Sequence, residues 1–208
     1  MTQRDLSRSI RPIAARNAHD RGAAQLKQAA IQAVAEEGFA GLTLDGLCAR
    51  ANITPTEFSQ NWSDPGDVLR AALDEQMRLP KLPDLGSLPD DLAAYLQGYL
   101  TRCSDHPAFL TCMFYVLTHA RSDEQLGPRI LSDFILRRAD NRILIERAVA
   151  RGDLPVGTDP DPILDEVLRL GLSWMGSGRT PSPEALKGAI QDLLVREAFR
   201  RDPFPQAR

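Results

Sequence analysis

Residues 43–62, TLDGLCARANITPTEFSQNW, decide the fold of this chain. Thr43 can cap a short helix over about 43–51, because a threonine oxygen accepts hydrogen bonds from the free N–H groups of a first helical turn. The side chains expected to face inward from this helix are Leu44, Leu47 and Ala51. Asn52 then favours a tight turn, since asparagine tolerates a left-handed backbone better than most residues.

A second short helix is predicted directly after this turn, over about 54–61. Thr54 and Glu57 are spaced as a capping box, in which each side chain bonds to the other residue's backbone, and Pro55 suits the first helical position. Two short helices joined by a four-residue turn have the spacing of a helix-turn-helix. In that motif the second helix presents side chains to the base edges of DNA.

The remaining chain also shows helical patterns, and the predicted class is all-α with about nine helices. No strand is expected, because no hairpin dipeptide separates alternating apolar runs. The first helix, over about 21–37, ends at Gly38, and glycine suits a left-handed C-cap. Its apolar stripe is formed by Leu26, Ala30, Ala33 and Val34. The other helices are expected over about 64–77, 89–103, 106–119, 125–151, 159–176 and 182–200.

Three parts are expected along the chain. Residues 1–20 form a flexible basic arm with four arginines and two aspartates. This arm is either a solvated tail or a cationic segment that touches DNA. Residues 21–66 form the helix-turn-helix domain, and residues 67–208 form a larger helical body. Prolines and a glycine between 80 and 88 mark a linker ahead of the body's main helices.

Composition excludes several classes of protein. The 208 residues are 43% hydrophobic and 25% charged, as in ordinary globular proteins, and no apolar run is long enough to cross a membrane. Three scattered cysteines favour neither a disulfide framework nor a metal site, so a reducing cytoplasm is expected. No nucleophile–base pair or glycine-rich phosphate loop indicates an enzyme, and no cofactor is expected. The net charge of −3 does not indicate nucleic-acid binding, so any evidence for such binding must come from particular residues and motifs.

One set of positions carries a family resemblance: Leu26, Ala30, Val34, Gly38, Thr43, Leu47, Ala51, Ile53, Thr54, Phe58, Trp62, Val68 and Leu69. In spacing and type this set resembles the N-terminal signature of tetracycline-repressor (TetR) family regulators. Residues 146–155 with 159–160 resemble the end of the long helix and the following turn in one common branch. Residues 178–179 with 182–184 resemble the last interhelical turn of that branch.

The resemblance implies a three-helix DNA-binding head on a larger helical body. It also implies a homodimer in the bacterial cytoplasm that binds a pseudo-palindromic, double-stranded operator. The residues that it places against DNA are Thr43, Arg50, Thr54, Pro55, Thr56, Glu57, Ser59, Gln60 and Asn61. Gln60 and Asn61 are chemically suited, because carboxamides pair with adenine, whereas Glu57 could accept from cytosine but is also needed for capping.

Several residues of the head depart from the family pattern. Asn52 stands where the family usually has glycine, Ser59 where it has tyrosine and Pro65 where it has lysine. Asn61 stands where the family often has histidine. The tyrosine, histidine and lysine contact phosphate in the family. Residues 21–75 hold four basic and eight acidic side chains, 4 − 8 = −4. Phosphate neutralisation supplies most non-specific affinity, so weak DNA binding is expected unless the arm compensates.

A TetR-like body would enclose a pocket for a small-molecule effector. The side chains expected to line it are Tyr99, Cys103, Phe109, Met113, Phe114, Leu117, Phe134 and Trp174. The alternative for each of them is ordinary core packing. As a set they favour a hydrophobic or aromatic effector.

The last two helices suggest a dimer interface, because the predicted helix over 159–176 is apolar nearly all round and must be buried on every side. The residues expected at the interface are Leu168, Leu172, Met175, Leu186, Ile190, Leu193 and Leu194. Burial within one chain is the alternative.

The leading hypothesis is a dimeric repressor that a ligand releases from its operator. The second is a ligand-binding dimer whose head has lost DNA affinity.

Overall fold

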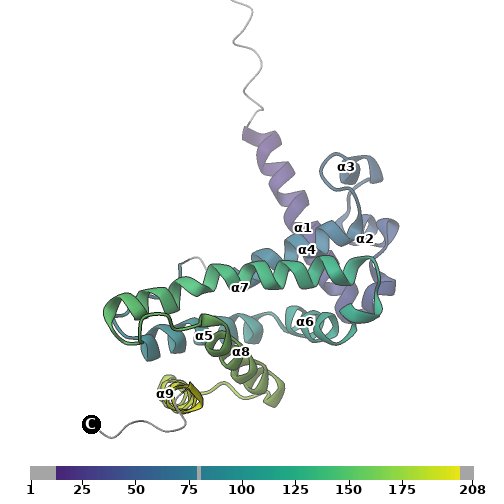
Figure 1. The fold of residues 1–208 in the computed structure, drawn as a ribbon. Coiled ribbons are helices and arrows are strands. Elements are labelled where there is room, and N and C mark those ends of the chain that lie inside the picture. The colour runs from purple at the N-terminus through teal and green to yellow at the C-terminus, as the bar shows by residue number, and fades with distance from the viewer. Residues whose placement is uncertain (1–12, 79–80, 202–208) are drawn as a thin grey trace, which may run out of the picture. The chain divides into compact units, whose positions relative to one another are not determined.

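The computed structural model describes residues 13–78 and 81–201, without the side chains of residues 13–20, 131, 133–140 and 197–201. These residues form nine α-helices and two short 3-10 helices and contain no strand, which confirms the all-α prediction (Figure 1). The chain divides into two compact units, residues 1–73 and 74–208. No helix in the described part of the chain is long and apolar enough to cross a membrane.

The N-terminal unit is a small helical head. Its elements are α1 (Ile13–Glu37), η1 (Gly38–Gly41), α2 (Leu44–Ala51), α3 (Pro55–Ser59) and most of α4 (Pro65–Met77). Helix α1 packs against α2 and η1, and α2 packs against α3. The predicted apolar stripe of α1 is buried here, together with Leu47, Ala51, Phe58, Val68 and Leu69. Gly38 adopts φ +68°, the left-handed backbone expected at the end of α1.

Three expectations about the head need correction. Helix α1 begins at Ile13, so residues 13–20 are helical and only 1–12 of the expected arm lie outside the described residues. The physical reason is that Ala14, Ala15 and Ala18 favour a helix and that neither proline nor glycine occurs between residues 13 and 21. Leu44 does not face inward but is 39% exposed, because it is the first residue of α2. Helix α3 ends at Ser59, two residues early.

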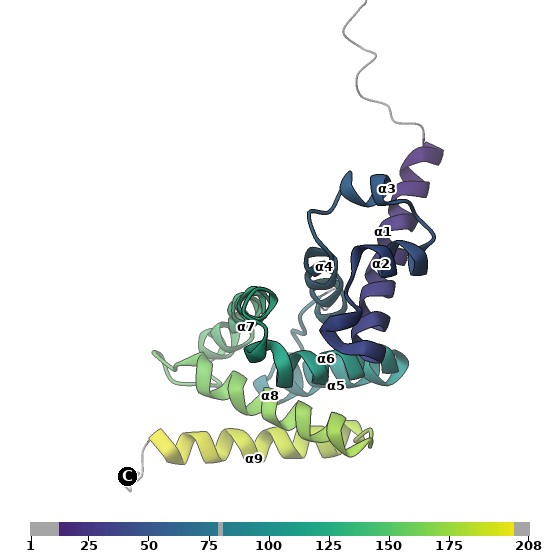
Figure 2. The same ribbon diagram turned by 90° about the vertical axis from the view of Figure 1, so that its right-hand side faces the viewer.

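The C-terminal unit is a helical body arranged around α5. Its elements are α5 (Leu88–Asp105), α6 (Pro107–His119), η2 (Ala120–Ser122), α7 (Leu126–Arg151), α8 (Pro160–Ser177) and α9 (Pro183–Arg201). Helices α6, α7, α8 and α9 each pack against α5, and α8 lies alongside α9 (Figure 2). Leu92, Leu144, Leu186 and Ile190 are fully buried in the resulting core.

A buried carboxylate ties the start of α5 to the end of α7. Asp91 is fully buried and accepts hydrogen bonds from the backbone N–H of Leu85 and, at 2.8 Å, from Nη2 of Arg151. Arg151 also bonds to Asp84 at 3.1 Å and to Asp153, which accepts from the Leu88 backbone N–H at 2.9 Å. The hydrogen bond to Asp91 is the main cause that raises the pKa of Arg151. The network therefore fixes the segment before α5 against the long helix.

Candidate nucleic-acid interface and effector region

The segment from α2 to α3 has the local geometry that its sequence predicts. The Oγ1 atom of Thr43 accepts from the Gly46 backbone N–H at 3.1 Å. Asn52 adopts φ +52°, and among described residues it is the only non-glycine with positive φ. Thr54 Oγ1 accepts from the Glu57 backbone N–H at 3.2 Å, and Glu57 Oε2 accepts from the Thr54 backbone N–H at 2.8 Å. The capping box is thus confirmed, and it fixes the residue at which α3 begins after the turn.

All nine residues predicted to contact DNA are exposed. Phe58, 3% exposed, anchors α3 in the core of the head, and the residues on either side of it face solvent. Several exposed side chains already hold intramolecular hydrogen bonds. Glu57 is engaged in the capping box, which lowers its pKa, and Ser59 donates to the Thr56 carbonyl at 3.1 Å. The exposed carboxamides of Gln60 and Asn61 follow at the end of α3.

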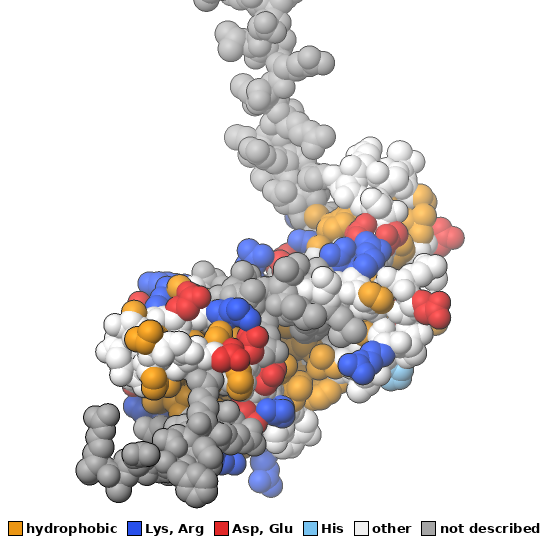
Figure 3. Space-filling model, in the orientation of Figure 1, with side chains coloured by type: hydrophobic (Ala, Val, Ile, Leu, Met, Phe, Trp, Pro, Cys, Tyr) orange, Lys and Arg blue, Asp and Glu red, His pale blue; other side chains and the backbone are white. Residues whose placement is uncertain are grey.

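Two basic residues of the head, Arg50 and Arg70, lie against carboxylates. Arg50 lies 2.8 Å from Glu36 and 2.6 Å from Glu37, and Arg70 lies 3.5 Å from Asp67. Sequence reasoning missed the pairing of Arg50, because its partners are on another helix. Figure 3 shows acidic and basic side chains interspersed on the face that it presents, among the residues drawn in colour.

The expected effector residues lie on four helices of the body: Tyr99 and Cys103 on α5, Phe109, Met113, Phe114 and Leu117 on α6, Phe134 on α7 and Trp174 on α8. Cys103, Phe109 and Met113 are buried, whereas Tyr99, Phe114, Leu117 and Trp174 are half-buried. The side chain of Phe134 is outside the described residues. Burial raises the pKa of Cys103 to about 11, so this thiol is protonated and unreactive at neutral pH.

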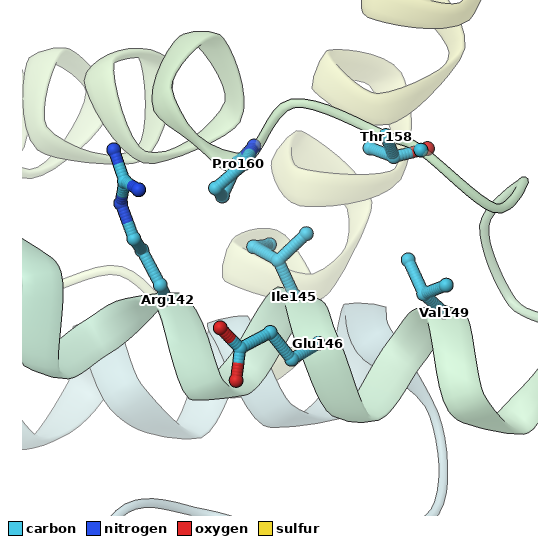
Figure 4. Close-up of a pocket in the computed structure, with 7 residues that line it drawn as sticks. Arg142, Ile145, Glu146, Val149, Thr158 and Pro160 are labelled. Carbon is cyan, nitrogen blue, oxygen red and sulfur yellow. The ribbon is translucent and has the colours of Figure 1, made fainter.

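Two cavities that are lined by described residues lie elsewhere in the body. One, of about 360 Å³, lies between α7 and the segment that leads into α8. Figure 4 shows Ile145 and Val149 projecting from α7 toward Thr158 and Pro160. The other, of about 350 Å³, lies between the N-terminal parts of α5 and α9. Neither is lined by a residue of the expected effector set.

Two residues of α5 hold the C-terminal end of α4, and sequence reasoning identified neither in this role. Arg102 donates from Nη1 to the backbone carbonyls of Gln76 at 2.7 Å and of Glu75 and Arg78, each at 3.3 Å. The hydroxyl of Tyr99 donates to the Met77 carbonyl. These bonds satisfy carbonyls that a helix end leaves without intrahelical partners.

The predicted interface residues separate into two groups. Leu186, Ile190 and Leu193 are at most 6% exposed and fill the core of the same chain against α5, so for these three the alternative of burial within one chain holds. On α8, Leu168 is 52% exposed, and Leu172 and Met175 are half-buried one and two turns further along. On α9, Leu194 is half-buried, and Val195, which the sequence analysis missed, is 54% exposed.

A match to a known protein family identifies the family of this chain. Residues 82–194, more than half of the chain, match the family model of the tetracycline repressor-like C-terminal domain. The chain belongs to the TetR family of transcriptional regulators. Proteins of this family are DNA-binding regulators and not enzymes.

Individual relatives and solved structures agree with this membership. The DNA-binding transcriptional repressor TetR of Mycobacteroides abscessus is 27% identical over 185 residues, which cover 85% of this chain and 95% of the relative. Two solved structures share the fold. The fatty acid degradation regulator FadR from Bacillus halodurans has a TM-score of 0.64 at 16% identity, over 82% of this chain and 96% of its own. A TetR-family regulator from Rhodococcus sp. has a TM-score of 0.61 at 19% identity, and the match covers 86% of this chain and 98% of that protein.

Proposed function

We propose that this protein is a homodimeric repressor that binds a pseudo-palindromic operator and is released from it by a small apolar or aromatic effector. The observation that carries the proposal is the exposed α3, which the left-handed Asn52 and the Thr54–Glu57 capping box fix after α2. A rigid turn matters because base readout needs side chains that are already placed when the helix enters the groove. Family membership supports the same conclusion.

Gln60 and Asn61 are the side chains that we expect to read bases. The double variant Gln60→Ala, Asn61→Ala should lose about 30-fold or more in specific affinity, since one good bidentate pair discriminates by about 1–3 kcal/mol. The measurement is fluorescence anisotropy of the full chain on the DNA upstream of its own gene, with unlabelled competitor DNA. Affinity for competitor DNA should change little, because the two carboxamides carry no charge.

Gln125→Ala serves as the matched control, since Gln125 is an exposed amide just before α7, outside the two helices of the proposed dimer interface. It should leave both affinities unchanged. A competitor-resistant complex that forms equally well with the double variant would contradict the assignment of Gln60 and Asn61. No saturable binding by the folded wild-type protein, even at low salt, would contradict the proposed function.

The body offers two features that favour an effector. The indole N–H of Trp174 is buried and has no acceptor among the described residues, so an effector with a carbonyl or similar acceptor would satisfy it once a pocket opens beside it. Tyr99 packs edge-on against Tyr95, at 4.9 Å between ring centroids, and also bonds to the end of α4. An effector that displaces Tyr99 would therefore loosen the end of the helix that continues into the head.

The exposed apolar residues of α8 and α9 support a dimer that is formed through these two helices. Leu168→Glu should convert the dimer to monomer at micromolar concentration, because it places a carboxylate in an apolar interface. Sedimentation velocity measures the change. Val156→Glu is the matched control: Val156 is 93% exposed but lies in the loop before α8, so this variant should remain dimeric. Dissociation of both variants, or of neither, would place the interface elsewhere.

The second candidate is a ligand-binding dimer with a weak DNA-binding head. The observation in its favour is electrostatic: the head carries net charge −4 over residues 21–75, and both Arg50 and Arg70 are paired with carboxylates. The anisotropy experiment separates the two candidates, since only the repressor forms a competitor-resistant complex.

A further inference from the structure

Two adjacent carboxylates at the end of α1 lie against the last turn of α2. The Nη2 atom of Arg50 is 2.8 Å from Oε2 of Glu36 and 2.6 Å from Oε1 of Glu37. Hydrogen bonds to Glu36 and then to Glu37 are the main causes that raise the pKa of Arg50. The three side chains together carry a net charge of −1, so a DNA phosphate that approaches Arg50 meets a group whose positive charge is more than neutralised.

The position of these carboxylates is unfavourable apart from their contact with Arg50. Glu36 and Glu37 are the last two residues of α1, where the helix dipole places partial negative charge. They also add negative charge to a head that must approach a polyanion. Arg50 offsets the local repulsion, but at the expense of its own attraction to DNA.

Arg50 lies in the part of the motif that approaches the phosphate backbone. It is the next-to-last residue of α2, two residues before the left-handed Asn52 and the turn into α3. In helix-turn-helix docking the first helix of the motif crosses the backbone while the second enters the groove. A guanidinium released at this point would be placed to bind a phosphate.

We propose that Glu36 and Glu37 are positioning residues that hold the Arg50 guanidinium away from the DNA backbone and so lower the electrostatic affinity of the head. The inference rests on the proposed DNA-binding function and deepens it, because it names the contact that limits affinity. The side chain of Arg50 is only 30% exposed, whereas those of Glu36 and Glu37 are 57% and 56% exposed. The carboxylates thus face the solvent that phosphate would replace.

The test uses full-length protein and a short, mixed-sequence DNA duplex, which reports phosphate contacts without any operator. Anisotropy titrations at several salt concentrations compare the wild type with Glu36→Gln/Glu37→Gln, with Arg50→Ala, and with the triple variant that combines them. The double variant should bind about ten-fold tighter at low salt, and its slope of log affinity against log salt should steepen by about 0.9, the value for one added phosphate contact. Arg50→Ala should remove this gain in the triple variant.

Two results would overturn the inference. A gain that persists in the triple variant would mean that removal of negative charge alone increases affinity. An equal loss on Arg50→Ala in the wild-type and double-variant backgrounds would mean that Arg50 already binds phosphate. Glutamine keeps the shape of glutamate and both pairs are at the surface, so the variants should fold, as circular dichroism can verify.

The duplex experiment and the operator experiment test the two proposals independently, so that one proposal can be contradicted while the other stands. A steeper salt slope without any competitor-resistant operator complex would defeat the proposed function and leave the role of the carboxylates intact. An operator complex with an unchanged slope in the double variant would defeat the role of the carboxylates alone. Absence of binding by the wild type and by every variant would defeat both.

Discussion

Arg151→Met should destabilise the protein by about 3 kcal/mol, because it leaves the buried carboxylate of Asp91 without its charged partner. Asp91 is fully buried, and beyond Arg151 it accepts from the backbone N–H of Leu85. Methionine fills a similar volume along the same path, so lost packing contributes little. Arg151 also holds Asp84 and Asp153, so the segment before α5 should loosen as well.

Urea unfolding at fixed protein concentration measures this effect, since the midpoint of the proposed dimer would depend on concentration. Arg142→Met is the matched control on the same helix. Arg142 pairs with Asp161 at 2.7 Å, but their side chains are 45% and 39% exposed, so the cost should stay below about 1 kcal/mol. Equal effects of the two substitutions would show that burial of Asp91 does not govern the stability of the body.

Gly127→Ala should cost about 3 kcal/mol, the upper part of the range for overpacking a tight contact. A Cβ atom at Gly127 would lie 1.7 Å from the backbone carbonyl oxygen of Ala120 in η2. The obstacle is main chain rather than a flexible side chain, so either η2 or the first turn of α7 must move. The contact is what allows α7 to begin directly against the preceding turn.

Gly188→Ala is the control for this prediction. Gly188 lies inside α9, and a Cβ atom there meets nothing within 4 Å. Alanine should stabilise the protein by about 0.5–1 kcal/mol, because glycine costs backbone entropy in a helix. The two midpoints should therefore move in opposite directions. A loss of stability in Gly127→Ala no larger than a few tenths of a kcal/mol would show that η2 yields without cost.

Local signals explain why the helix-turn-helix was predictable. The Thr54–Glu57 capping box, the Thr43 cap and the left-handed Asn52 each depend on residues at most three apart, so their geometry follows from the chain itself. Helix α1 shows the limit of such reasoning. The polar, non-periodic segment before residue 21 predicts a start there, yet the backbone is helical from Ile13.

The candidate contacts of the body were less predictable, because apolar periodicity shows that a helix is buried but not against what. Leu186, Ile190 and Leu193 repeat at helical spacing just as an interface stripe would, yet α5 of the same chain covers them. The hydrogen bonds from Arg102 to the carbonyls at the end of α4 could not be predicted from the sequence, since an arginine in the last turn of a helix usually faces solvent.

By itself the sequence determined the all-α class, the two short helices and the turn that presents Gln60 and Asn61. These features depend on backbone preferences and on hydrogen bonds between near neighbours in the chain. Only the tertiary structure decided that Glu36 and Glu37 hold Arg50, that Arg151 neutralises buried Asp91, and that Leu168 and Val195 stay exposed. The reason is physical: each of these outcomes depends on where one helix crosses another.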